Sequence, residues 1–377
     1  MRSDSGPEPA SVEEVLQLLD TWPRDSAEPL LPMGASRDSG HAVSERILEL
    51  LVSSRHRKGS LEEMQFASCR HRLLERIDRC VTRGGPIELT LMAFPFKVPN
   101  PAKVGWRRLP DLAELASLCR LRMLHDEVQA LHAPGLRLHL IHDGSYIGDV
   151  FGVANDEVRQ YEAYFQYLIA KVAMESVVRT HDFTGLLLHR REDVEASLER
   201  IAARALAWFH NERDSAEWQG CFQRTLGMIN LRDVSVRTAS HLLEIAALGL
   251  VPGSLNGVQH RVQAAMLRYR IRDTVLHACD PRPQLFPDAI HLTSQNRPGR
   301  LAIWLVRRGD SRLPWHGVGV VDSQGRAKVL PYEVVHATPD FRPVRLRGEG
   351  APFAYVVEPR SASAGRWPPS AAARRVA

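Results

Sequence analysis

A proline-rich segment that follows an apolar run constrains this chain more than any other stretch. Residues 87–94 are apolar enough on both faces to form a central strand, and residues 112–131 have a helical pattern. Residues 95–103 contain three prolines together with Lys97 and Lys103. Because proline fixes φ and restricts the residue before it, we expect a stiff cationic loop at a strand end. Such loops often bind ligands in α/β proteins, but a rigid connector with solvated lysines fits the same residues, and both interpretations stay open.

Carboxylates follow both this loop and the next strand. Asp111 and Glu114 have the spacing of a helix N-cap and the third helical residue, which predicts a capping box. Residues 136–141 alternate as a second strand, which ends at Asp143-Gly144. A carboxylate at a strand end commonly meets a ligand, and the alternative for Asp143 is a turn residue before glycine.

Strand and helix patterns alternate in the first half of the chain. The pairs 87–131 and 136–175 predict an α/β fold, with a Rossmann-like mixed sheet flanked by helices. A helical middle and a strand-rich C-terminal part follow, and we expect the C-terminal strands to join or cover the same sheet. Helices are expected at 43–83, 194–209, 218–230, 235–248 and 256–279, and strands within 177–188 and at 289–292, 301–306, 318–321, 328–330 and 353–357, with a hairpin turn at 322–325.

The two ends of the chain differ from the rest in composition. Residues 1–44 mix Pro, Ser, Gly and charge, and we expect a flexible arm apart from an amphipathic helical pattern at 12–19. Residues 361–377 are mostly Ala, Ser, Pro and Arg, and we expect a disordered tail. Residues 45–360 are left as one folded domain.

Composition excludes several classes of function. The net charge of +5 is mild for 377 residues and is not concentrated in a basic run, so nucleic-acid binding is not indicated. The five cysteines form no Cys-x-x-Cys pair, and buried reduced thiols in a cytoplasmic protein are the expected state. No apolar run has the roughly 18 residues needed to span a bilayer, so we expect no membrane association.

The remaining polar residues suggest acid–base chemistry on an anionic substrate. The chain lacks the glycine-rich loops that bind nucleotide phosphates, the Gly-x-Ser-x-Gly elbow and any His-x-x-x-His metal pair, so we expect neither a cofactor nor a metal. Rigid lysines, carboxylates at strand ends, a helix with Arg268 and Arg270, and the pair Trp315-His316 remain. Cations of this kind would hold a phosphate, while Asp, Glu and His would move protons on a carbonyl-bearing substrate.

Three segments resemble those of the isocyanide (isonitrile) synthases, the pyoverdine/dityrosine biosynthesis family. The resemblance covers roughly residues 45–357. The loop and the helix start keep the family residues Pro95, Phe96, Lys97, Pro99, Asn100, Lys103, Val104, Leu109, Pro110, Asp111 and Glu114. The second segment is found as Pro134-Gly135, the strand 136–141, Asp143-Gly144 and Asp149, and the third as Pro314-Trp315-His316.

This resemblance implies a catalytic domain that joins an amino acid, usually tyrosine or tryptophan, to ribulose 5-phosphate. The amine would condense with the C2 ketone, phosphate would be lost, and carbon–carbon cleavage would leave C2 as the isocyanide carbon. An oxygenase of the same pathway is the implied downstream partner. The implied catalytic residues are Asp143, Asp149, His316 and Glu114, and the implied substrate-binding residues are Lys97, Asn100, Lys103, Asp111, Arg268, Arg270, His291 and Trp315. We expect loss of either loop lysine to leave folding unchanged, because lysine seldom anchors a core.

One departure from the family pattern bears on the substrate. The family reads Arg-Leu-Ser-x-His where this chain has His291-Leu292-Thr293-Ser294-Gln295. A missing guanidinium weakens bidentate anion binding, and a missing imidazole removes a group that titrates near neutrality. Two alternatives to a typical isocyanide synthase therefore stay open: a related carbon–nitrogen condensing enzyme with another amino acid or a formamide-type product, and a non-catalytic ligand-binding relative.

Overall fold

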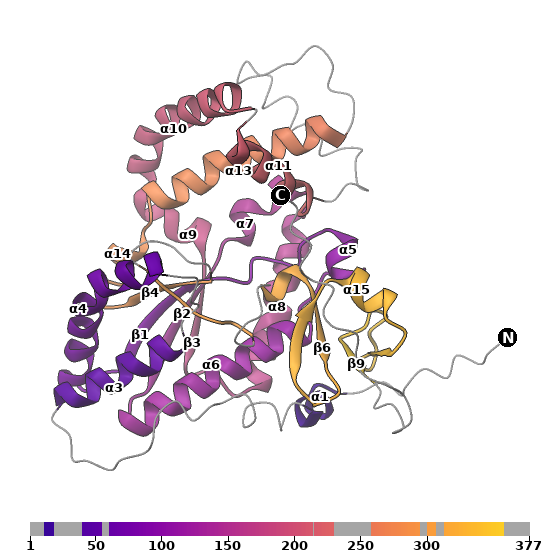
Figure 1. Cartoon of the computed structure of the whole chain (residues 1–377). Helices are drawn as coiled ribbons and strands as arrows, with labels where there is room; N and C mark the ends of the chain where they lie inside the picture. The colour runs from indigo at the N-terminus through magenta and orange to yellow at the C-terminus, as the bar shows by residue number, and fades with distance from the viewer. Residues whose placement is uncertain are drawn as a thin grey trace.

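A five-stranded sheet lies at the centre of the molecule. The computed structural model describes residues 11–18, 40–54, 60–213, 215–229, 258–294, 300–306 and 313–357. Each pairing within the central sheet is parallel, and the strand order is β3-β2-β1-β4-β5 (Figure 1). The strands are β1 (Ile87–Met92), β2 (Leu136–His142), β3 (Val178–Asp182), β4 (Ile290–Thr293) and β5 (Leu301–Ala302).

The two strands read most clearly from the sequence are neighbours in this sheet. Ile87 of β1 pairs with Leu136 of β2, and the register continues to Met92 and Ile141. Both strands are almost entirely buried, as expected for a parallel sheet covered on both faces. The prediction that residues 87–94 and 136–141 share a sheet is confirmed, and so is the mixed α/β fold with helices flanking a parallel sheet.

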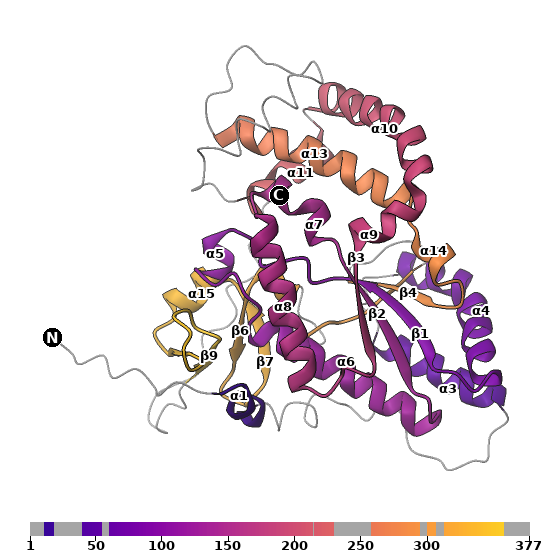
Figure 2. The same cartoon turned by 180° about the vertical axis from the view of Figure 1, so that it is seen from behind.

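Helices surround the sheet (Figures 1 and 2). The helix α6 (Leu112–Leu131) has the predicted bounds, and it begins at the predicted capping box of Asp111 and Glu114. It packs against β2, α3 and α8. The predicted helical region 43–83 is found as α3 (Gly40–Ser53) and α4 (Ser60–Thr82), and the helix after β2 is α8 (Asn155–Lys171).

A group of three helices, which we call the helical cap, lies over the carboxyl ends of the strands (Figures 1 and 2). It consists of α10 (Arg191–Asn211), α11 (Ala216–Leu226) and α13 (Val258–Ala278), and α13 contacts the other two. Short elements connect the strand ends to the cap: α5 (Pro101–Val104) after β1, α7 (Gly144–Ile147) and η1 (Gly148–Phe151) after β2, α9 (Phe183–Leu187) and η2 (Leu188–Arg190) after β3, and α14 (Arg282–Leu285) before β4.

The C-terminal strands divide between two sheets. β4 and β5 join the central sheet as expected, whereas β6 (Val318–Val321), β7 (Ala327–Leu330), β8 (Phe341–Val344) and β9 (Ala354–Val357) form a second sheet of order β7-β6-β9-β8. The expectation that the C-terminal strands join the central sheet thus holds for β4 and β5, while the other four strands form a sheet of their own. The second sheet packs on the start of α6 so closely that a Cβ at Gly319 would lie 2.5 Å from the backbone nitrogen of Ala113. Short elements in this region are η3 (Pro314–His316) and α15 (Tyr332–Ala337).

Several predictions need correction or lie outside the described residues. The strand predicted within 177–188 is found as β3 and is followed by α9, whereas β5 is shorter than predicted and β8 was not predicted. Within the predicted arm, α1 (Val12–Leu18) buries Val12 and Val15 in the main core. The predicted helix 235–248 and the predicted tail 361–377 lie outside the described part of the chain.

Candidate functional site

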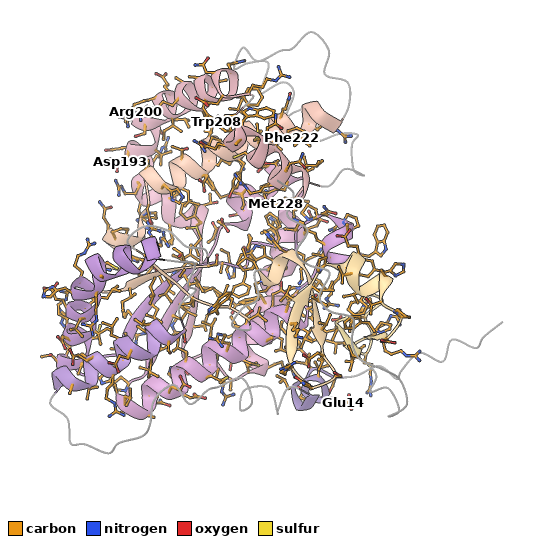
Figure 3. All side chains as sticks on the ribbon, viewed as in Figure 1. Glu14, Asp193, Arg200, Trp208, Phe222 and Met228 are labelled. Atoms are coloured by element: carbon orange, nitrogen blue, oxygen red, sulfur yellow. The ribbon has the colours of Figure 1, made fainter. Side chains whose placement is uncertain are left out.

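A cavity of about 480 Å³ lies between the helical cap and the carboxyl ends of β1, β2 and β4. This is the position at which open α/β sheets usually bind ligands, and the volume is that of a small-molecule site. Its apolar wall includes Phe96, Phe151, Tyr269 and Trp315. Trp208 and Met228 line it from the side of the cap, where Figure 3 labels both residues. Its Lys, Arg, Asp and His residues are Lys103, Asp143, Arg224, Arg270, Asp273, His277, Arg282, Arg300 and His316.

The structure brings together five of the residues selected from the sequence. Lys103, Asp143, Arg270, Trp315 and His316 all line the cavity, although they come from separate segments. The remaining predicted site residues do not line it: Lys97, Asn100, Asp111, Glu114, Asp149, Arg268 and His291. Their contacts show that they support the walls of the cavity and its attachment to the cap.

Lys97 is buried in the core and lies neither in solvent nor on the cavity wall. Its Nζ is 3.0 Å from Asp111 Oδ1 and 2.9 Å from Glu114 Oε2, and all three side chains are essentially unexposed. It also donates to the carbonyl oxygens of Pro314 at 3.0 Å and Gly317 at 2.9 Å. The expectation for Lys97 assumed a lysine outside the core, whereas the structure places its charge among buried carboxylates and carbonyl groups.

These contacts fix the turn that carries Trp315 and His316. Lys97 binds the carbonyl groups on both sides of the pair, and the backbone N–H of Val98 donates to the Trp315 carbonyl at 3.0 Å. The Trp315 ring packs edge-on against Phe94, with ring centroids 5.2 Å apart. The loop lysine thus acts on the cavity through the Trp-His turn.

The carboxylates of the capping box are part of the same buried cluster. Glu114 accepts a hydrogen bond from the Tyr161 hydroxyl at 3.1 Å and from the backbone N–H of Asp111 at 2.9 Å. Burial raises the pKa of Glu114 to about 7, against the opposing charge of Lys97. Two carboxylates and one lysine share this site. A raised pKa favours the protonated, neutral form of one carboxyl, and the net negative charge of the buried cluster is then smaller.

Asn100 and Asp149 attach the cap to the sheet. Asn100 caps α5 through Ala102, and its Nδ2 donates at 3.0 Å to the carbonyl of Gly227, at the end of α11. Asp149 in η1 binds Arg268 at 2.6 Å and also Arg272, both from α13. The family-like residues Asn100, Asp149 and Arg268 therefore hold the cap over the cavity.

Asp143 lies on the cavity wall because the chain turns sharply after β2. It occupies the N-cap position of α7 without a side-chain capping bond to that helix. A Cβ at Gly144 would lie 2.2 Å from the Pro95 carbonyl oxygen, so only glycine allows the loop after β1 to approach this closely. The Asp-Gly pair thus joins the ends of β1 and β2, and the carboxylate stands at their junction.

His291 links β4 to β1 and does not line the cavity. Its Nδ1 is 2.8 Å from the Thr90 hydroxyl. Burial lowers the pKa of His291 to about 4, and the nearby charges of Arg282 and Arg76 lower it further. Thr293, the last residue of the same strand, and Ser294, which follows it, do line the cavity. Gln295 lies outside the described residues.

Sequence reasoning missed several cavity residues: Arg224, Asp273, His277, Arg282 and Arg300. Arg282 and Arg300 flank β4 and β5, so their positions beside predicted strands were a usable signal. The sequence carried no such signal for the helix residues Arg224, Asp273 and His277, because charged residues are common on exposed helix faces.

The part of the chain that the structure describes was compared with two kinds of feature, a metal-binding cluster and a membrane-spanning helix, and contains neither. Among the described residues, no group of three or more His, Cys, Asp or Glu side chains is arranged to hold a metal ion. None of the helices in the described part of the chain has the length and apolar character needed to cross a bilayer.

Comparison with known proteins supports the resemblance. Residues 77–220 match the profile of the family described as pyoverdine/dityrosine biosynthesis protein. An L-tyrosine isonitrile synthase from Pseudomonas aeruginosa is 28% identical over 72% of this chain and 82% of its own length. An L-tryptophan isonitrile synthase from Fischerella ambigua is 31% identical over 36% of this chain and 42% of its own.

The fold also has a solved counterpart. The crystal structure of the PvcA protein from Pseudomonas aeruginosa superposes with a TM-score of 0.61, covering 84% of this chain and all of that one, at 22% sequence identity. The two proteins therefore share a fold. The sequence matches show that this enzyme is similar to the isonitrile synthases of the pyoverdine/dityrosine biosynthesis family, and the solved structure shows that the fold is shared.

Proposed function

We propose that this enzyme forms an isonitrile from the amine of an aromatic amino acid, tyrosine or tryptophan, and ribulose 5-phosphate. Relatives named for each of these two amino acids support the first substrate. The observation that carries the proposal is the composition of the cavity, in which five Lys or Arg side chains surround an aromatic wall. One substrate brings a carboxylate and an aromatic ring, and the other brings a phosphate, so the pair needs both features.

The chemistry requires proton transfer between atoms held close together. Imine formation at C2 of the sugar phosphate needs a proton for the departing water, and later cleavage steps need a base. Asp143 and His316 line the cavity and supply a carboxylate and an imidazole for these steps. Lys103 and Arg270 are proposed to bind substrate anions, and Trp315 to form a wall against the amino-acid side chain.

Arg270 has partners that orient it. Its Nη1 is 3.0 Å from Glu217, and its guanidinium lies 4.6 Å from the centre of the Trp208 ring. Stacking on an aromatic face and pairing with a carboxylate hold a guanidinium in one plane, which favours binding of a planar or tetrahedral anion. Arg270 thus has the geometry of a ligand-binding group supplied by the cap.

The remaining parts of the proposal rest on the resemblance. The enzyme would work in the cytoplasm and pass its product to an oxygenase of the same pathway. A formamide-type product or another amino acid is the second candidate, favoured by His291 at the position of the family arginine. A binding protein without catalysis is the third.

The test is product analysis with labelled sugar phosphate. The enzyme is incubated with ribulose 5-phosphate carrying ¹³C at C2 and with each amino acid in turn. The masses of the products are then measured by mass spectrometry. An isonitrile that keeps the label is the expected result. A labelled product heavier by one water would show a formamide, and ligand binding without any product would show a non-catalytic relative.

A variant series ties the activity to this cavity. Asp143→Asn is expected to lower kcat by about 100-fold or more, the usual contribution of a positioned acid or base. Asp126→Asn, at an exposed position of α6, is the matched control and should behave as the wild type. Unchanged kcat in Asp143→Asn would remove Asp143 from the mechanism.

A further inference from the structure

Four of the five Lys and Arg side chains of the cavity, all except Arg270, belong to two clusters at different places in the fold. One, which we call the arginine end, contains Arg282 and Arg300 with the hydroxyl residues Thr293 and Ser294. The other, the lysine end, contains Lys103 and Arg224. All six residues line the cavity. Figures 1 and 2 show α14, which begins at Arg282, beside β4, and α5, which contains Lys103, well apart from it beside α15.

The side chains of the arginine end are held in place by one shared carboxylate. Asp280 accepts from Nε of Arg282 at 2.8 Å and from its Nη2 at 2.7 Å, and it also binds Nη2 of Arg300 at 3.0 Å. Only 1% of Arg282 is exposed. Although burial opposes ionisation of Asp280, the hydrogen bonds and charge of Arg282, with Arg300, lower its pKa to about 2. One carboxylate therefore fixes two guanidinium groups beside the cavity.

A ligand in the cavity would meet the remaining donors of this cluster. Asp280 takes the Nε and Nη2 edge of Arg282, so Nη1 is the group that a cavity ligand would reach. Thr293 and Ser294 add hydroxyl groups at the carboxyl end of β4. Two guanidinium groups with two hydroxyls match the several oxygens of a phosphate dianion better than a single carboxylate.

The lysine end lies where the loop after β1 meets the cap. Asn100 binds the Gly227 carbonyl, and a Cβ at Gly227 would lie 3.2 Å from Lys103 Nζ. Arg224 belongs to the last turn of α11, just before Gly227. The aromatic wall is on this side: α5 contacts the Trp315 turn, and Phe151 packs against Tyr269 with ring centroids 5.3 Å apart.

We propose that the arginine end binds the phosphate of the sugar phosphate and that the lysine end binds the carboxylate of the amino acid. The assignment rests on the proposed function. It places the dianion at the denser set of donors, and it places the amino-acid ring against the aromatic wall. The amine nitrogen of the amino acid and C2 of the sugar phosphate then meet between the ends, near Asp143 and His316.

Two matched charge-removing variants test the assignment. Arg300→Gln and Arg224→Gln are compared with Arg191→Gln, an exposed control at the start of α10. Binding of ribulose 5-phosphate, inorganic phosphate and the amino acid turned over by the wild type is measured by calorimetry. Arg300→Gln is expected to weaken binding of both phosphates by about 10- to 100-fold, as for loss of a charge-assisted hydrogen bond, and to leave amino-acid binding within about twofold.

Arg224→Gln is expected to weaken binding of the amino acid and to leave binding of both phosphates within about twofold. Arg191→Gln should match the wild type for all three ligands. If Arg300→Gln does not fold, Ser294→Ala replaces it, because this change removes a hydroxyl without disturbing Asp280. A smaller loss confined to the phosphate ligands is then expected.

The binding and product measurements together distinguish a wrong assignment of the two ends from a wrong proposed function. Loss of amino-acid binding in Arg300→Gln, or of phosphate binding in Arg224→Gln, would overturn the assignment while isonitrile formation by the wild type upholds the function. Wild-type phosphate binding in both variants would also overturn it. A wild type that binds phosphate through Arg300 but forms no isonitrile would overturn the function and keep the phosphate site.

Discussion

Lys97 has four polar partners, which come from the start of α6 and from the Trp-His turn. Its side chain is unexposed, and two of its partners are carboxylates. When one member of a buried ion pair is removed, the other is left as an uncompensated charge in a medium of low dielectric constant, which costs about 3–5 kcal/mol. A single buried lysine thus couples the helix start to the cavity wall.

We therefore expect Lys97→Met to lower the free energy of unfolding by about 3–5 kcal/mol. Lys103→Met, at a half-buried position on the cavity wall, should lower it by less than about 1 kcal/mol. Denaturant titrations of the two variants and the wild type provide the comparison. Equal stability of the two variants would mean that the buried cluster contributes nothing net, and Lys97 would then need another explanation.

At the scale of secondary structure, the helix α13 is joined to the sheet by charge. Asp149 at the start of η1 faces two arginines of α13, one turn apart, and Arg272 also donates to the Tyr146 carbonyl. Arg268 is buried at this contact. Without the carboxylate, two guanidinium groups would stand together without their shared counter-ion, and the contact between α13 and η1 would weaken.

Asp149→Asn is accordingly expected to loosen the cap without unfolding the sheet. Amide hydrogen exchange should become faster in residues 144–151 and 258–278 and stay unchanged in β1 and β2, because local opening follows the loss of local contacts. Glu217→Gln, which removes the exposed partner of Arg270, is the control. Uniform acceleration over the whole molecule would indicate general destabilisation, and no acceleration would show that the clamp is unimportant.

At the scale of the whole molecule, the buried cluster should make stability depend on pH. The pKa of Glu114 is raised from 4.5 to about 7 by burial. Between these values the folded protein holds a proton that the unfolded chain has released. The stabilising contribution of Glu114 is therefore complete below about pH 4.5 and is lost as the pH rises through about 7. Burial lowers the pKa values of His142 and His291, and these histidines give the opposite slope.

The comparison with Glu114→Gln isolates the carboxyl group. Unfolding free energies of wild type and variant, measured from about pH 5 to pH 8, should differ in slope, with the wild type losing more stability as the pH rises. Because the histidines are common to both proteins, their effects cancel in the difference. Parallel curves would show that Glu114 keeps an ordinary pKa in the folded protein.

The sequence by itself determined the features that depend on neighbouring residues. The apolar pattern of β1 and β2, the bounds of α6 and the turn between β6 and β7 were all predicted, since periodicity, capping and turn chemistry act over a few residues. Asp111 and Glu114 were readable as a capping box for the same reason. Asp143 was readable as a group at the end of a strand, where topology directs ligands.

Only the tertiary structure decided what the loop lysines do. Lys97 and Lys103 are six positions apart on one loop, yet one is buried and the other lines the cavity. The carbonyl partners of Lys97 lie 217 and 220 positions away along the chain, and no local pattern encodes such a distance. The same holds for Arg224, Arg282 and Arg300, which line one cavity only because the cap closes over the strand ends. Whether a charge binds a ligand or the core depends on the groups that surround it, and folding alone supplies them.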